Sequence, residues 1–127
     1  MLSPIPRRIL RDKMTLSVPA GFDRYQKPLT PATYEVESVH LQSDNTTRKT
    51  ADNTEVTLNG IIFVDARYST PALDYDALQA SVQALGGVMT CTVESRRGSV
   101  SGPHTILVVD NLPDDEGNLH HWELGVV

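Results

Sequence analysis

At 127 residues, with 39% apolar and 21% charged side chains, the chain has the size and composition of one globular domain. No apolar run approaches the roughly 18 residues that indicate a membrane-spanning helix, and the basic N-terminus lacks the apolar stretch of a secretory signal. The single cysteine, Cys91, excludes an internal disulfide and fits a reducing compartment. We therefore treat residues 1–127 as a single domain.

Charge is distributed unevenly along the chain. Residues 1–27 carry six basic and two acidic side chains, a balance of +4, whereas residues 28–127 carry five basic and fourteen acidic ones, a balance of −9. Opposite charges of this size predict attraction between neighbouring copies or toward differently charged partners. Because the whole chain is acidic, specific binding to duplex nucleic acid is not expected, although contact with a phosphate backbone inside a larger assembly stays open.

The first residues are expected to form an extended N-terminal arm over 1–11, because Pro4 and Pro6 cannot join regular pairing. A strand over 12–19 follows, in which alternate residues are apolar and share one face: Met14, Leu16 and Val18. Residues 20–32 hold the Gly and Pro pattern of a loop.

The next strand, 33–41, contains a change of phase. Tyr34 and Val36 are apolar at even positions, whereas Val39 and Leu41 are apolar at odd ones. One extra residue near Glu37-Ser38 restores a single inward face, so the pattern predicts a β-bulge there. Bulges bend strands and favour a strongly curled sheet.

A long polar tract then leads into a nearly continuous apolar run. Residues 42–55 contain one apolar side chain, Ala51, and are predicted to be a long polar loop. The strand 56–65 is apolar on both faces, which is typical of a central strand covered on each side. We expect the helix over 74–85 to provide that cover, with Asp74 as its cap, Gly86-Gly87 at its end, and an apolar stripe: Tyr75, Leu78, Val82 and Leu85.

Three further strands are expected in the remaining residues. They span 88–94, 105–110 and 120–127, with a turn at 96–98 and an acidic loop at 111–118. The predicted fold class is α+β, a mainly antiparallel curled β-sheet or small β-barrel with one helix packed on it. The residues expected to face inward on the first and last of these strands are Met89, Cys91, Val93, Trp122, Leu124 and Val126.

Candidate catalytic or metal-binding groups are sparse. His120, His121 and Glu123 lie close together, but zinc usually requires at least three convergent protein ligands and no other spaced ligand motif is present. Cys91 could pair with a histidine as a nucleophile, yet its neighbours alternate like those of a core strand. We therefore expect no enzyme activity, no catalytic residues, no metal and no cofactor.

Several stretches resemble the minor capsid proteins of tailed bacteriophages and prophages. They are the run HLQSDNTTRKTADNTEVTLNGIIFVDARYSTPALDY over 40–75, the opening Ile5-Pro6-Arg7-Arg8, and the closing strand His120 to Leu124. By analogy of size and strand order, the chain is also similar to head-closure (stopper) proteins, which form a ring below the portal. In these proteins a long loop between two strands points into the central channel and helps retain packaged DNA.

The resemblance implies a structural subunit of the virion head–tail neck, assembled in the cytoplasm of the bacterial host. Its implied partners are copies of itself in a ring, the portal protein and other neck proteins, with non-specific contact to packaged DNA and no membrane. An arm that docks on a neighbouring subunit or the portal corresponds to Ile5, Arg7, Arg8 and Arg11. The channel loop corresponds to Asp44, Asn45, Thr46, Thr47, Arg48, Lys49, Thr50, Asp52 and Asn53.

Two alternatives of other classes remain at this point. One is a non-catalytic module on a small β-barrel that binds nucleic acid or peptide without forming a ring. The other is a small enzyme that uses Cys91 or the group His120, His121 and Glu123. For the polar tract itself, the alternative is a surface loop with no role.

Overall fold

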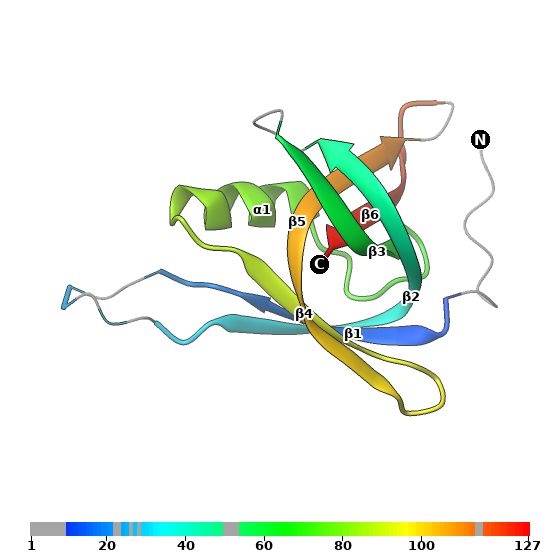
Figure 1. The fold of residues 1–127 in the computed structure, drawn as a ribbon, viewed down its shortest axis with the longest axis horizontal. Coiled ribbons are helices and arrows are strands. Elements are labelled where there is room, and N and C mark those ends of the chain that lie inside the picture. The colour runs from blue at the N-terminus through cyan, green and yellow to red at the C-terminus, as the bar shows by residue number, and fades with distance from the viewer. Residues whose placement is uncertain (1–9, 22–23, 26, 28, 50–53, 114–115) are drawn as a thin grey trace.

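A computed structural model describes residues 10–21, 24–25, 27, 29–49, 54–113 and 116–127 (Figure 1). Within these residues the chain forms six strands and one helix. Their bounds are β1 (Asp12–Val18), β2 (Ala32–Lys49), β3 (Glu55–Asp65), α1 (Tyr75–Ala84), β4 (Met89–Glu94), β5 (Val100–Pro113) and β6 (Leu119–Val126). In this part of the chain, no helix has the length and apolar character needed to cross a lipid bilayer.

The strands form one antiparallel sheet that closes on itself in the order β1-β2-β3-β6-β5-β4. Each neighbouring pair is antiparallel, including the closing pair β1 and β4. The expected mainly antiparallel, curled sheet with one helix is therefore confirmed. Closure leaves no long unpaired edge among these strands, which removes a surface prone to aggregation.

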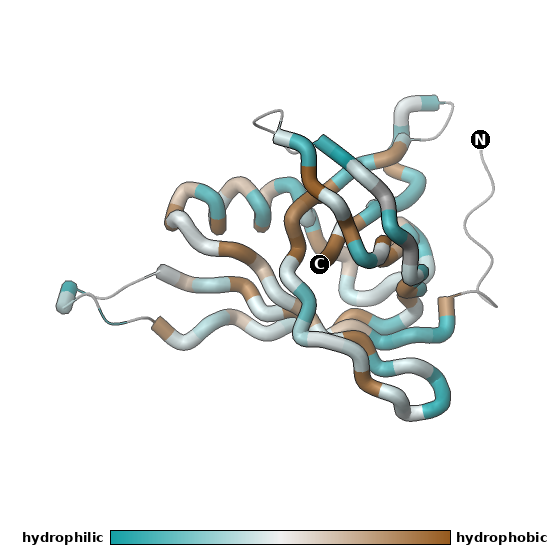
Figure 2. The backbone as a smooth tube through the Cα atoms, viewed as in Figure 1, coloured by the Kyte–Doolittle hydropathy of each residue, from teal (hydrophilic) through white to brown (hydrophobic). Residues whose placement is uncertain are grey.

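The core lies inside the closed sheet. Apolar and polar residues alternate along the strands (Figure 2), and the inward sets predicted for 12–19, 88–94 and 120–127 are all buried. The strand residues of the core cluster are Met14, Leu16, Val18, Val36, Val39, Ile62, Val64, Met89, Cys91, Val93, Ile106, Trp122, Leu124 and Val126.

The predicted β-bulge is confirmed at Ser38. In the β1–β2 pairing, Asp12 lies opposite Val39 and Lys13 lies opposite Glu37, so Ser38 has no partner and takes a φ of 62°. The extra residue lets Val36 and Val39 both be fully buried at 0% exposure. The Ser69 hydroxyl donates to the Ser38 carbonyl oxygen (2.5 Å) and accepts from the Asp65 N–H (2.9 Å), which fixes the bulge against the turn after β3.

Helix α1 begins and ends as predicted, but it packs differently. The Asp74 side chain accepts from the Ala77 N–H at 3.1 Å, and Leu85 is the C-cap. Tyr75 and Val82 insert into the core, with the Tyr75 ring edge-on to the Trp122 ring at 5.5 Å. The helix lies mainly against β5 and does not cover β3, so that expectation was wrong. Leu85 ends the predicted stripe at 42% exposure.

Two strands are longer than the sequence indicated. β2 continues from Gln42 to Lys49 through the tract predicted to be a loop, and β5 spans Val100–Pro113, longer than the predicted 105–110. In β5 the Gly102-Pro103 pair, which favours a turn, is accommodated where the register against β4 shifts. A β-carbon on Gly102 would lie 2.9 Å from the Cys91 carbonyl oxygen, so the strand needs glycine at this close approach.

Candidate functional site

The polar tract forms a β-hairpin rather than a loop in its described residues. Beyond a register shift between Ser43 and Thr46, β2 pairs with β3 as far as Lys49 opposite Glu55. The expectation of a loop over 42–55 is therefore wrong for Gln42–Lys49, and residues 50–53 lie outside the described residues. Pairing satisfies the backbone N–H and C=O groups without any apolar side chain, and β-branched threonines favour a strand.

The hairpin bends where the register shifts. Gly60 lies opposite Ser43, and a β-carbon on Gly60 would lie 3.1 Å from both the Gln42 carbonyl oxygen and a Leu41 methyl carbon. Glycine thus permits the close approach that the bend requires. Beyond the bend, side chains of the hairpin contact β5 and β6, two strands that come much later in the chain.

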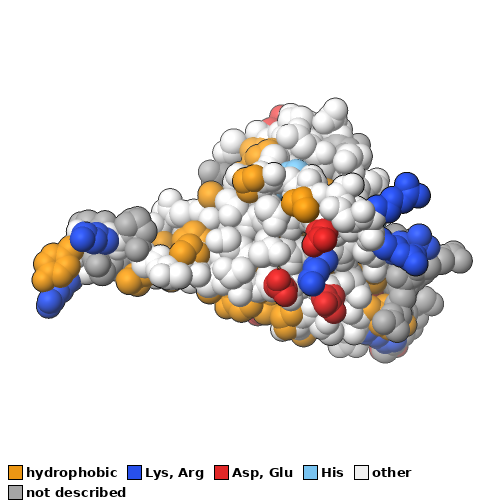
Figure 3. Space-filling view, turned by 90° about the horizontal axis from the view of Figure 1, so that it is seen from below, with side chains coloured by type: hydrophobic (Ala, Val, Ile, Leu, Met, Phe, Trp, Pro, Cys, Tyr) orange, Lys and Arg blue, Asp and Glu red, His pale blue; other side chains and the backbone are white. Residues whose placement is uncertain are grey.

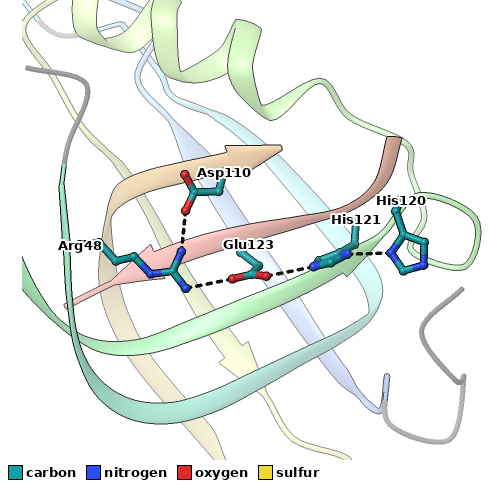
Figure 4. Close-up of polar contacts among 5 residues, drawn as sticks. All are labelled: Arg48, Asp110, His120, His121 and Glu123. Carbon is teal, nitrogen blue, oxygen red and sulfur yellow. Dashed lines mark hydrogen bonds and ion pairs between the residues drawn. The ribbon is translucent and has the colours of Figure 1, made fainter. Parts of the chain in front are cut away.

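Arg48 is one of two anchors that hold the hairpin against the closed sheet (Figure 4). Its Nη1 donates to Asp110 Oδ2 of β5 at 2.8 Å, and its Nη2 donates to Glu123 Oε1 of β6 at 3.1 Å. Asp110 and Glu123 are register partners, so one guanidinium bridges two adjacent carboxylates on neighbouring strands. Because the Arg48 side chain is 35% exposed, solvent screens the pairs and each contributes about 1 kcal/mol or less.

Leu58 is the second anchor, on the β3 arm of the hairpin. It is 1% exposed although it does not belong to the main core cluster. Its two methyl groups occupy the space beside Gly125, where an added β-carbon would lie 2.5 Å from Leu58 Cδ1 and 3.2 Å from Val108 Cβ. The missing side chain of Gly125 therefore forms a socket for Leu58.

The histidines predicted as metal candidates extend the Arg48 network. Glu123 Oε2 lies 3.0 Å from His121 Nε2, and His121 Nδ1 lies 2.8 Å from His120 Nδ1 (Figure 4). Phe63 lies between the rings of His40 and His121, with centroid separations of 6.1 and 6.2 Å. Across the residues described, no three His, Cys, Asp or Glu side chains converge as a metal site. Glu123 is engaged with Arg48 instead.

Cys91 lies in the core and is not placed to act as a nucleophile. The side chain is 2% exposed, and burial raises the pKa of the thiol to about 12. A thiol with that pKa is protonated at neutral pH, whereas the thiolate is the reactive form. The geometry gives Cys91 a packing role beside Tyr75, whose buried hydroxyl has its pKa raised first by burial and then by Cys91.

Some of the predicted site residues lie in the described part of the chain and others do not. Asp44, Asn45, Thr46, Thr47, Arg48 and Lys49 belong to the hairpin strand β2, while Thr50, Asp52 and Asn53 lie outside the described residues. Of the predicted arm, Ile5, Arg7 and Arg8 also lie outside them. Arg11 lines a groove with Asp12, Arg96 and Arg97.

Sequence reasoning missed the partners of Arg48 and Leu58. Asp110 ends an apolar run, and Glu123 alternates with the inward Trp122 and Leu124, so both could be placed on an outward face. Nothing in the sequence indicated that Arg48 would reach residues 62 and 75 positions away. The role of Gly125 could not be predicted, because a single glycine in a strand does not indicate which side chain will occupy the space beside it.

Comparison with known proteins identifies the family. No curated protein and no solved structure matches the chain. A family model described as minor capsid protein matches residues 6–96, which is more than half of the 127 residues. The match includes the β2–β3 hairpin, helix α1 and strand β4. The chain therefore belongs to the minor capsid protein family of phages, whose members have a structural role in the virion.

Proposed function

We propose that this minor capsid protein is a head–tail connector of the head-closure type, a ring subunit beneath the portal that helps retain packaged DNA. The observation that carries the proposal is the anchored polar hairpin of β2 and β3. It stands at the place in the chain where head-closure proteins carry their channel loop. In a ring, identical hairpins would gather around one axis.

The anchors support this role because they set the direction of the hairpin. Arg48 and Leu58 tie opposite strands of the hairpin to β5 and β6. A hairpin with a fixed base can present the same polar segment from each copy, whereas a free loop would first have to be ordered at an entropic cost. Threonine and asparagine side chains of this segment offer hydrogen bonds between neighbouring copies.

The anchors also determine which basic side chain of the hairpin would lie nearest to DNA. Residues 42–55 carry Arg48 and Lys49 against Asp44, Asp52 and Glu55, a balance of −1. Arg48 is engaged by Asp110 and Glu123, which leaves Lys49 as the nearest basic side chain beyond the clamp. A weakly acidic hairpin gains little from attraction to phosphates. The proposed retention is therefore steric, by narrowing the channel.

The predicted arm completes the proposal. Residues 1–11 carry Arg7, Arg8 and Arg11, and we propose that this basic arm docks on a neighbouring subunit or on the portal. Opposite charge in residues 28–127 supports docking between copies.

Assembly is the first test. Light scattering coupled to size-exclusion chromatography would measure the mass of the protein alone and after mixing with the portal protein of the same virion. We expect a ring, either alone or on the portal. A monomer without affinity for the portal would contradict the proposal and favour the alternative, a non-catalytic module that binds nucleic acid or peptide.

Shortening the hairpin tests the retention role. Lys49 lies opposite Glu55, so replacing residues 50–54 by an Asn-Gly turn keeps the register and leaves both the Arg48 clamp and Leu58 in place. We expect heads that assemble but lose packaged DNA, measured by nuclease sensitivity. Lys49→Gln is the matched control, since it removes a charge at full hairpin length and should leave retention unchanged. Full retention with the shortened hairpin would rule out the steric role.

A further inference from the structure

An open groove lies beside the start of β1, away from the Arg48 clamp. Its volume is about 570 Å³, and it lies between residues 11–12, the middle of β2 and the β4–β5 hairpin. Its floor is apolar, from Leu41, Val93 and Val100, and Val100 is 67% exposed. Together these three side chains give the groove an apolar surface on which an apolar side chain of a partner can pack.

The rim of the groove is basic. Arg11, Arg96 and Arg97 line it, with Asp12 as the acidic residue in the lining. The Asp12 carboxylate accepts from the Leu41 N–H at 2.9 Å and lies 3.9 Å from His40 Nδ1, and both of these residues also line the groove. Figure 3 shows Lys and Arg side chains at the two ends of one face, and a further one among the acidic side chains between them. The groove therefore suits a ligand with carboxylates next to an apolar side chain.

We propose that this groove binds the acidic segment 111–116 of a second copy of this chain. That segment reads Asn-Leu-Pro-Asp-Asp-Glu, with Leu112 and Pro113 followed by three consecutive carboxylates. Leu112 and Pro113 match the apolar floor, and the carboxylates match the arginine rim, where charge-assisted pairs form. The inference rests on the proposed ring for its biological setting, but the binding itself can be tested without a ring.

The two halves of this contact lie at opposite ends of one strand. β5 begins at Val100, in the groove, and ends at Pro113, in the acidic segment. In Figure 1 the β4–β5 hairpin and the β5–β6 connection extend to opposite sides of the molecule. One copy cannot bring its own segment into its own groove. Contact between opposite ends of successive copies is heterologous, the type of interface that generates a ring when the rotation between copies closes.

Charge argues against two other occupants. The N-terminal arm of the same chain carries Arg7 and Arg8, which would meet Arg96 and Arg97 as like charges. Nucleic acid would approach a chain whose overall net charge is −5, and an apolar floor offers nothing to a phosphate backbone. An acidic peptide of this chain satisfies both the rim and the floor.

A peptide-binding experiment tests the contact directly. The probe is a fluorescent synthetic peptide of residues 109–119 (VDNLPDDEGNL), titrated with the full chain at low salt and followed by anisotropy. We expect saturable binding that weakens as salt rises. The Arg96→Glu, Arg97→Glu double variant should lose affinity about tenfold or more, because two charge pairs become repulsive. A peptide with Asp114→Lys and Asp115→Lys should recover affinity for that variant.

Any one of four outcomes would overturn the inference. Equal binding of a peptide with Asp114→Asn, Asp115→Asn and Glu116→Gln, or no binding at millimolar peptide, would show that the groove does not recognise these carboxylates. Tighter binding of a 12-nucleotide DNA probe than of the peptide would assign the groove to nucleic acid instead. A ring that persists in the double variant without peptide binding would leave the proposed function intact and refute this contact alone.

Discussion

Leu58 of β3 fills the space that a side chain on Gly125 of β6 would need, with its Cδ1 only 2.5 Å from the position of an added β-carbon. This relationship ties the hairpin to a strand that comes more than sixty positions later in the chain. Together with the ion pairs of Arg48, it makes the hairpin a fixed part of the domain.

Gly125→Ala should destabilise the protein and displace the hairpin. A new methyl group at this position must move Leu58 or the backbone, which costs about 1–3 kcal/mol in the free energy of unfolding. Urea denaturation would measure the loss. Gly87→Ala is the matched control, because its added β-carbon would meet its nearest neighbour at 3.5 Å, an ordinary contact, and should be nearly neutral.

A double-mutant cycle distinguishes a clash with Leu58 from any other destabilising effect of a side chain at position 125. In a Leu58→Ala background the methyl group of Gly125→Ala has room, so its cost should fall well below the cost in the native background. Equal costs in both backgrounds would show that Leu58 is not the residue that requires glycine at position 125.

Local structure could be predicted from the sequence where burial requires apolar side chains at regular spacing. The phase change between Val36 and Val39 located the bulge at Ser38, because the core requires both side chains inside. The cap at Asp74 located the helix in the same way. The hairpin was missed because backbone hydrogen bonds between its strands stabilise it, and these need no alternating apolar side chains. Its two anchors are single residues, which form no pattern in the sequence. A glycine or proline inside a strand, as at Gly102, is read as a turn in the sequence, so the full length of β5 could be recognised only from its pairing with β4.

Cys91 should make stability fall at alkaline pH. The pKa of the thiol is about 12 in the folded protein against an ordinary value of 9.0, since burial disfavours the thiolate. Below pH 9 both states hold the proton and stability is unaffected, whereas above it the unfolded state releases the proton first. Stability should then fall by up to about 1.4 kcal/mol per pH unit. Tyr75, whose pKa is also raised, adds a loss above its ordinary value of 10.0.

Cys91→Ala tests this assignment through the shape of the pH profile. The variant loses some packing at every pH, but its free energy of unfolding should decline less between pH 9 and pH 10 than that of the native protein. Parallel profiles over that interval would mean that the thiol does not titrate differently in the two states. Urea denaturation at each pH provides the measurement.

Ser69→Ala should destabilise the bulge. The Ser69 hydroxyl bonds both the Ser38 carbonyl oxygen and the Asp65 N–H, and Ser69 is 3% exposed, so water cannot readily replace it. Leaving the buried Asp65 N–H and the partly buried Ser38 carbonyl without this partner costs about 1–3 kcal/mol. Ser38→Gly, in contrast, keeps the carbonyl and relieves the positive φ of 62°, so it should be neutral or stabilising. Thermal unfolding of both variants would check the opposite signs.

Arg48→Gln should loosen the hairpin more than it unfolds the domain. The substitution leaves Asp110 and Glu123 facing each other as unneutralised register partners, and it removes both pairs that hold β2 to β5 and β6. Because Arg48 is 35% exposed, we expect a loss of about 1 kcal/mol at low salt, shrinking in concentrated salt. Amide hydrogens of Thr47 and Thr57 should exchange faster, since local opening of the hairpin becomes easier. Lys49→Gln removes the same charge one position away and should change neither quantity. If the two variants behave alike, net charge rather than the Arg48 clamp governs the hairpin.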